Sequence, residues 1–197
     1  MGITAYPLIR SRLVTVMTRR SSRTPRPALR ELGLLQDVSQ RLVFIGIAVV
    51  LINLVTMRYR VEGPSMESQL ENGQVLVLNR LAYKIGSPSR GDIVVFHERT
   101  VSAQDLIKRI IGLPGETVEI RYDKVWINGV MLDPAWEPEC ISCESGIWTL
   151  GPHEYFVMGD HRAVSRDSRA FGPVRDEMFV GKVVWRYWPL DRFGPVS

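Results

Sequence analysis

One apolar run limits what this chain can fold into. Sixteen residues, Leu42 to Met57, carry no charge, and Arg41 and Arg58 stand at the two ends of the run. As a helix the run would extend about 24 Å, a little less than the roughly 30 Å hydrocarbon layer of a membrane. The flanking arginines can reach the headgroup region and close this gap. A buried core helix is the alternative, but a helix without a polar face favours a membrane span. We therefore predict a transmembrane helix over residues 42–57.

The positive charge of the chain lies before this run. Residues 1–41 contain eight arginines but only Glu31 and Asp37 as acids, a net charge of +6, which leaves −2 for the rest of a +4 chain. Arginine-rich flanks stay on the cytoplasmic side of a membrane. We expect a basic cytoplasmic arm over 1–41 and an exported domain over 58–197, attached to the cell membrane by a single span. An organellar transit peptide is the alternative, which would place the domain beyond an organellar inner or thylakoid membrane.

After the apolar run, short segments rich in β-branched and aromatic residues alternate with turn residues. The segments with the length and composition of strands are residues 74–79, 92–97, 105–111, 116–122, 124–129, 154–158 and 180–188. Close spacing of this kind, without a helical period, predicts a mainly β fold with antiparallel strands. Residues 131–150 are the least regular segment, and we expect them to form an excursion from the core.

Both cysteines, Cys140 and Cys143, lie in this irregular segment. Two thiols cannot complete a structural zinc site, and His97, His153 and His161 lack the spacing of metal ligands. A local disulfide is favoured in an exported loop, with free thiols as the alternative. We therefore expect no metal site.

One of the predicted strands contains a lysine among apolar residues. In DLIKRII, residues 105–111, the alternation of a strand puts Lys108 on one face with Leu106 and Ile110, and Asp105 on the other. An edge-strand lysine that reaches water is the ordinary explanation. Burial without a carboxylate partner would instead lower the lysine pKa by several units. The neutral amine could then take a proton from a serine hydroxyl.

A serine turn and a polar stretch could supply partners for such a lysine. Ser65 follows Gly63 and Pro64 in a predicted turn shortly after the apolar run. The stretch MGDHRAVSRDSRAFG, residues 158–172, contains many side chains able to hydrogen-bond one another, with Asp167 and Arg169 as a natural ion pair. Taken separately, such segments are most often turns and solvated loops.

Together these segments resemble the motifs of type I signal peptidases. GPSM (63–66), IKRIIGLPGE (107–116) and MGDHRAVSRDSRAFG follow one apolar run in this order, and the resemblance covers about residues 58–192. It implies a largely antiparallel β catalytic domain with an inserted lobe around residues 115–152. It also implies an endopeptidase that removes signal peptides from translocated preproteins, after small residues at positions −3 and −1, without a metal or an organic cofactor.

The resemblance assigns catalytic and supporting roles to particular residues. Ser65 matches the nucleophile of the family, Lys108 its general base, and Ser165 the serine that hydrogen-bonds and orients the lysine. The residues that match the supporting set of the site are Asp160, Asp167 and Arg169.

The turn around the nucleophile departs from the family pattern. Gly63 stands where many members have a Ser or Thr that helps to stabilise the oxyanion, so this task would fall to backbone N–H groups, chiefly that of Ser65. Met66, which follows the nucleophile, is typical of the family. His161 replaces a common Asn, and SMESQL differs from S-M-x-P-T-L, and both changes could reshape the substrate groove.

Two other functions fit parts of the pattern. His161 could activate Ser65 with Asp167 as its orienting group, but Lys108 would then have no role. A catalytically silent, membrane-anchored β module that binds exported chains is the second alternative, although silent relatives generally lose the nucleophile or the base.

The expected partners follow from the resemblance and from the arginine arm. They are preprotein signal peptides and membrane lipid, while contact with the protein translocation machinery is left open. The arm has no DNA-binding helix pair before the apolar run, so no nucleic acid partner is expected. Trp185, Tyr187 and Trp188 near the end of the chain are predicted to pack in the core of the last strand, with contact to a bilayer as the alternative.

Overall fold

The computed structural model describes residues 27–98, 104–122, 124–133 and 145–196. Its contacts divide the chain into two units, Met1–Gly46 and Ile47–Ser197. The segment with Cys140 and Cys143 lies outside the described residues, so a disulfide between them stays a prediction.

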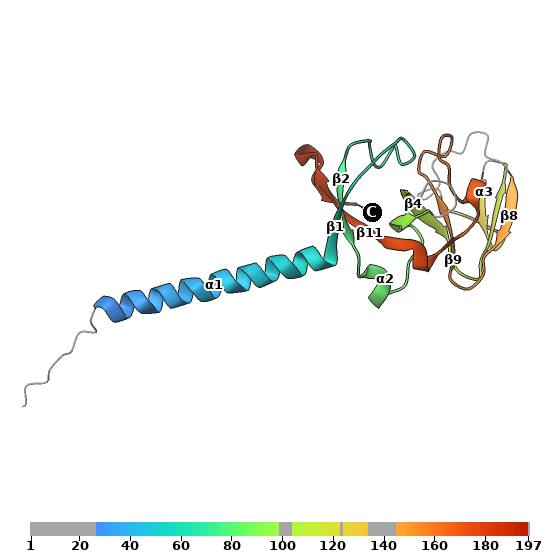
Figure 1. The fold of residues 1–197 in the computed structure, drawn as a ribbon. Helices are drawn as coiled ribbons and strands as arrows, with labels where there is room; N and C mark the ends of the chain where they lie inside the picture. Colours follow the sequence, from blue (N-terminus) through green and yellow to red (C-terminus); the bar gives the residue numbers. More distant parts are fainter. Residues whose placement is uncertain (1–26, 99–103, 123, 134–144, 197) are drawn as a thin grey trace, which may run out of the picture. The chain divides into compact units, whose positions relative to one another are not determined.

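The apolar run belongs to a helix that is longer than the predicted one. Helix α1 spans Pro27–Val55 (Figure 1), and proline suits the first turn of a helix, where its missing N–H would have no partner. The part Gly33–Val55 is long and apolar enough to cross a membrane by length and composition. The helix ends before residue 57 because Thr56 and Met57 pair with Asn79 and Leu78 as a strand.

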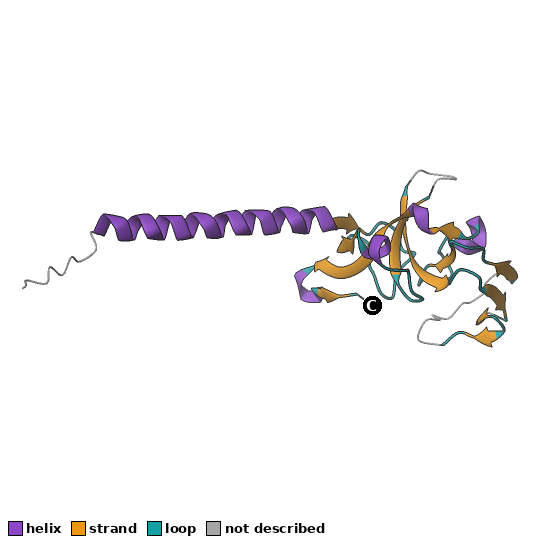
Figure 2. Ribbon diagram, turned by 90° about the horizontal axis from the view of Figure 1, so that it is seen from below, coloured by secondary structure: helices purple, strands orange, loops and turns teal. Residues whose placement is uncertain are grey.

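In its described residues, the second unit contains two antiparallel sheets, and the larger one has eight strands. Its strands run in the order β1-β2-β11-β3-β4-β9-β10, and β12 pairs with β11. Figure 1 labels β1, β2, β4, β9 and β11 of this sheet, and Figure 2 draws the strands in orange. Their bounds are β1 Thr56–Arg60, β2 Val75–Asn79, β3 Ile93–His97, β4 Asp105–Gly112, β9 Glu154–Met158, β10 Val174–Arg175, β11 Phe179–Trp188 and β12 Gly194–Pro195. Short helices α2 (Ala82–Ile85) and α3 (Ser168–Phe171) and two 3-10 turns (Asp176–Met178 and Leu190–Arg192) lie between strands.

A second antiparallel sheet is formed by the chain between β4 and β9. Its order is β7-β6-β5-β8, with bounds β5 Thr117–Arg121, β6 Lys124–Ile127, β7 Val130–Met131 and β8 Gly146–Thr149. The prediction of a mainly β, antiparallel fold is confirmed, and every predicted strand overlaps an observed one. Within the segment 131–150, which looked least regular, residues 146–149 form β8 and pair with β5 in this second sheet.

Strand β4 is buried on both faces, which explains why its sequence does not alternate cleanly. Ile107 belongs to one hydrophobic cluster, with Val95 of β3, and Ile110 belongs to another, with Val94. Any polar side chain in the middle of this strand is therefore removed from water. This places Lys108 and Arg109 where a charge is costly.

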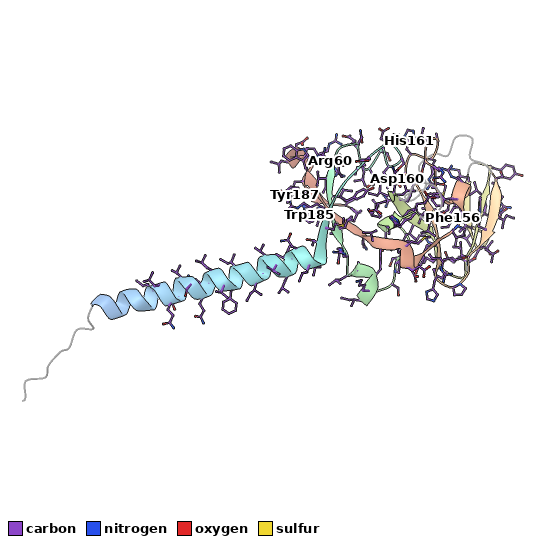
Figure 3. The ribbon with its side chains drawn as sticks, viewed as in Figure 1. Arg60, Phe156, Asp160, His161, Trp185 and Tyr187 are labelled. Atoms are coloured by element: carbon purple, nitrogen blue, oxygen red, sulfur yellow. The ribbon has the colours of Figure 1, made fainter. Side chains whose placement is uncertain are left out.

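The aromatic residues late in β11 are not core residues. Trp185, Tyr187 and Trp188 are 37%, 47% and 51% exposed, and Figure 3 labels the first two on β11. This part of the strand has passed β3 and pairs with β2 and the short β12. Trp185 packs edge-on against Phe193 at a centroid distance of 5.4 Å. The prediction of core packing is therefore wrong for these three side chains.

Candidate active site

Ser65 lies in the loop between β1 and β2, directly after a turn that needs glycine. Gly63 has a φ of +85°, a backbone conformation that residues with a Cβ rarely adopt. Its N–H donates to the Asn72 side chain at 3.1 Å and is thus already engaged. In the described part of the chain no acceptor contacts the N–H of Ser65. Met66 is fully buried in a core cluster, so its side chain anchors the loop and does not face a groove.

Lys108 comes from the middle of β4 and meets Ser65 directly. Its side chain is only 2% exposed, and its Nζ lies 2.8 Å from Oγ of Ser65, a residue 43 positions away in sequence. The amine also donates to the Ile107 carbonyl at 3.0 Å. A neutral amine in this position has one N–H held by a carbonyl, while its lone pair can accept the serine proton.

The surroundings of Lys108 favour the neutral amine. Burial lowers the pKa of Lys108 from 10.5 to about 8, although Asp167 and Asp160 act in the opposite direction. The carboxylates do not prevail because each is paired with an arginine, Asp167 with Arg169 and Asp160 with Arg109. The arginines therefore help to keep the lysine available as a base.

The Asp160–Arg109 pair is buried and bidentate. Nε and Nη2 of Arg109 each lie 2.9 Å from a carboxylate oxygen of Asp160, and the two side chains are 5% and 3% exposed. The third donor, Nη1, contacts the Gly91 carbonyl at 2.8 Å. Sequence reasoning missed Arg109. Its position beside Lys108 in a strand of isoleucines was the signal, because a buried guanidinium needs an acid partner.

Asp167 and Arg169 form the ion pair expected from the sequence. Nε and Nη2 of Arg169 lie 2.8 and 2.9 Å from the two carboxylate oxygens. Asp167 is fully buried, caps α3 by accepting the Arg169 N–H, and also accepts the Gly159 N–H at 3.0 Å. Arg169 in turn donates to the Arg162 carbonyl at 2.7 Å. The pair thus fixes the polar stretch after β9 from several sides.

Ser165 is close to the nucleophile loop but makes no hydrogen bond to Lys108. Its Oγ is buried and has no partner among the described residues, while the lysine amine donates to a backbone carbonyl instead. A Cβ on Gly159 would lie 2.2 Å from this Oγ and 2.4 Å from the Ser65 carbonyl oxygen. Glycine at 159 therefore allows Ser165 and Ser65 to approach each other.

His161 touches Ser65 only through its backbone. Its N–H donates to the Ser65 carbonyl at 3.1 Å, whereas Nδ1 of the imidazole lies 3.5 Å from the Glu67 carboxylate. Asp160 and His161 follow β9 (Figure 3). No contact in the described part of the chain joins the imidazole to the Ser65 hydroxyl, so this geometry does not support a serine–histidine pair.

A cleft leads to the Ser65 and Lys108 side chains. It has a volume of about 370 Å³, and its other lining residues are Arg58, Tyr59, Arg60, Glu62, Gln104, Asp105, Leu106 and Ile107. The Tyr59 hydroxyl donates to the Asp105 carbonyl at 2.8 Å and so connects β1 with β4. Within the described residues, no group of three or more His, Cys, Asp or Glu side chains is arranged to hold a metal ion.

Known proteins resemble the chain over most of its length. Residues 34–188 match the family model described as signal peptidase, peptidase S26. Signal peptidase IB of Staphylococcus aureus (strain COL) is 31% identical over 180 residues, 80% of this chain and 93% of the relative. Signal peptidase I of Bacillus caldolyticus is 39% identical over 166 residues, which are 76% of this chain and 90% of the relative. The crystal structure of a signal peptidase I from Enterococcus faecalis V583 is 35% identical, with a TM-score of 0.42, and covers 49% of this chain and 96% of its own.

A match over this share of the chain, in the family model and in both relatives, identifies the enzyme class as well as the fold. The protein is a serine endopeptidase, and it belongs to the type I signal peptidases of the peptidase S26 family.

Proposed function

We propose that the protein removes signal peptides from translocated preproteins with a catalytic dyad of Ser65 and Lys108. The observation that carries this proposal is the 2.8 Å contact between Oγ of Ser65 and the nearly inaccessible Nζ of Lys108. Nucleophile and base within hydrogen-bond distance are the signature of an activated serine. Membership of the signal peptidase family supplies the substrate class, and small residues at −3 and −1 are the expected cleavage determinants.

The reaction follows from the positions of these groups. The neutral Lys108 amine accepts the Ser65 proton as Oγ attacks the scissile carbonyl. The unengaged N–H of Ser65 is then available to stabilise the oxyanion. Collapse of the tetrahedral intermediate breaks the peptide bond, and the ammonium of Lys108 gives its proton to the leaving amine. Water, deprotonated by the same amine, then hydrolyses the acyl-enzyme.

The supporting residues hold this geometry and tune its charge. Asp160 and Asp167 would brace the loop after β9, and their arginine partners limit the effect of the carboxylates on Lys108. Ser165, whose Oγ is buried beside Gly159, would confine the loop near the dyad and need not bond the lysine in the resting enzyme. A positional error of about 1 Å at a reacting group can cost about a hundredfold in rate, so such bracing matters.

The proposed location is a membrane, with α1 as the anchor. Gly33–Val55 has the length and composition of a span, and the arginines before it favour a cytoplasmic N-terminus. The exposed aromatic side chains of β11 are of the kind that rest at a membrane surface. Protease is added to intact cells whose wall has been removed. It should digest the chain after Arg58 and leave the basic arm, residues 1–41, uncut. Digestion of the arm alone would overturn this orientation.

A cleavage assay separates the enzyme from a silent binding module. The full-length protein in detergent is incubated with a preprotein that has small residues at −3 and −1, and the products are sized and sequenced. Wild type should cut once, after the −1 residue, and Ser65→Ala should reduce the rate to background because the attacking oxygen is gone. Ser87→Ala, at an exposed serine outside the loop between β1 and β2 and outside the lining of the cleft, is the matched control and should keep the wild-type rate. Background turnover in all three proteins would favour the binding module.

The pH dependence of cleavage should report on Lys108. Because the neutral amine is the reactive form, kcat/KM should rise about tenfold per pH unit below about 8 and level off above it. At pH 7 about one molecule in ten is then reactive, against about one in three thousand for a lysine at its ordinary pKa. The measurement is the rate against pH with an uncharged peptide substrate. A midpoint near 10.5 would mean that the lysine is not desolvated, and one near 6.5 would point to a histidine.

A further inference from the structure

The end of the chain contacts the loop that carries the nucleophile. We call residues 189–196 the C-terminal strap, which contains the 3-10 turn Leu190–Arg192 and strand β12, and residues 61–74 the nucleophile loop. We propose that the C-terminal strap is a positioning element for Ser65, acting through the nucleophile loop. The inference rests on the proposed role of Ser65 as nucleophile.

The nucleophile loop is closed at its base and anchored by two side chains. The N–H of Val61 donates to the Gln74 carbonyl, and the N–H of Gly73 donates to the Val61 carbonyl, both at 2.9 Å. Met66 and Leu70 are fully buried in one core cluster. Residues 67–69 and 71–73 are exposed, so these parts of the loop depend on other contacts for a fixed position.

The C-terminal strap and the adjoining end of β11 supply such contacts after Ser65. The Arg192 guanidinium pairs with the Glu71 carboxylate. Arg186, which pairs with Gly194 of β12 in the sheet, donates from Nη2 to the Gln69 carbonyl at 3.0 Å. These two arginines therefore hold the loop on either side of the buried Leu70, at Gln69 between the Met66 and Leu70 anchors and at Glu71 directly after them.

Apolar packing ties the C-terminal strap to the same cluster. Val196 packs against the cluster that contains Met66, and its N–H donates to the Val184 carbonyl at 3.3 Å. Phe193 packs against Trp185. The strap is thus fixed to β11 on one side and linked to the nucleophile loop on the other, as a positioning element must be.

Two further observations bear on this role. One concerns the extent of the family match, and the other concerns the residues that line the cleft. The match to the family model ends at residue 188, so the C-terminal strap lies outside the part of the chain that the model covers. The cleft next to Ser65 is lined by residues between 58 and 65 and between 104 and 108, and none of its lining residues belongs to the strap. Loss of a strap contact should therefore change kcat and leave KM nearly constant.

The Arg192–Glu71 pair gives the sharpest test. Both side chains are about half exposed, 46% and 57%, and exposed ion pairs contribute little to stability. A small shift of a reacting atom is costly, however. A positioning role therefore predicts an effect on rate without a matching effect on unfolding temperature, whereas a purely structural role predicts that the two change together or that neither changes.

The experiment compares four full-length variants with wild type in detergent, measuring kcat, KM and Tm with one preprotein substrate. Arg192→Met and Glu71→Gln should each lower kcat about three- to tenfold, with KM and Tm nearly unchanged. The exchanged pair Arg192→Glu with Glu71→Arg should restore most of the rate. Arg175→Met removes a comparable exposed pair, with Glu177, in which each side chain is 56% exposed, and should behave as wild type.

The outcomes separate this inference from the proposed function. The inference is wrong if Arg192→Met has the same kcat as Arg175→Met, or if kcat falls only together with Tm. It is also wrong if the exchanged pair does not raise kcat above that of the single variants. An inactive wild-type protein would instead count against the proposed function, on which this inference rests.

Discussion

Replacing Lys108 with methionine should lower the rate of preprotein cleavage by about a hundred- to ten-thousandfold, the usual contribution of a general base. Methionine removes the amine and keeps the length of the apolar part of the side chain, with sulfur in place of one methylene. The Ser65 hydroxyl, now without the group that lies 2.8 Å from it, has no base to accept its proton. The measurement is kcat/KM for a preprotein at pH 8, beside wild type and Ser65→Ala.

The same variant should remain folded, and its stability should depend less on pH than that of wild type. The pKa of Lys108 is about 8 in the folded protein and about 10.5 in a solvated chain, so the unfolded state binds more protons between these values. The stability of wild type therefore increases as the pH rises through this window and decreases as it falls to about 8. Lys108→Met should unfold at an equal or higher temperature at pH 7 and lose this pH dependence.

A matched control distinguishes the lysine from the nearby histidine. His161→Asn keeps the backbone N–H that contacts Ser65 and removes the imidazole, which faces Glu67. We expect this variant to keep a rate within a few-fold of wild type. Cleavage by Lys108→Met at the wild-type rate, together with an inactive His161→Asn, would reverse the assignment of the base.

Asp160→Ala should have the largest effect on folding, lowering the free energy of unfolding by about 3–5 kcal/mol. The change leaves the Arg109 guanidinium, which is 5% exposed, without its bidentate partner in the interior. Chemical denaturation of the full-length protein in detergent measures the loss. Any folded fraction should also show a lower midpoint in its pH–rate profile, because Asp160 raises the pKa of Lys108.

A double variant tests the cause of that loss. Asp160→Leu combined with Arg109→Met removes both charges and keeps apolar volume, and such replacements are often neutral or stabilising. The double variant should therefore recover most of the stability that Asp160→Ala loses. If Asp160→Ala and the double variant are equally unstable, the Asp160–Arg109 pair stabilises the fold through the packing of its side chains and not through charge compensation. A stable Asp160→Ala protein would show that water reaches Arg109.

The strands could be predicted because their signals are local, whereas the proposed dyad of Ser65 and Lys108 was assigned by the resemblance to type I signal peptidases. Runs such as QVLVLN and DIVVFH, bounded by turn residues, are strands in the structure with shifts of one residue at an end. Gly63 and Pro64 marked the turn before Ser65, and Lys108 stood out as a charge within an apolar strand. The segment 146–149 was missed because its short GIWT signal follows a long irregular stretch and needs β5 as a partner.

The details of the site depended on contacts that a sequence does not contain. Arg109 was passed over although it neutralises Asp160, and the expected Ser165–Lys108 hydrogen bond is replaced by one to the Ile107 carbonyl. Similarly, Trp185 looked like a core residue by type but is 37% exposed, although this part of β11 pairs with β2 and β12. Whether a side chain is buried is decided by what packs over it, and that is set by segments far away in the chain.

By itself, the sequence determined an apolar helix and a series of antiparallel strands, because periodicity, turn residues and residue type are local properties. Its resemblance to type I signal peptidases pointed to Ser65 and Lys108 as the residues of the proposed dyad. Only the tertiary structure decided that the two reactive atoms meet, that water is kept from the amine, and that two arginines compensate the nearby carboxylates. Distance and desolvation are properties of folded chains, since they depend on atoms that the sequence separates by tens of residues.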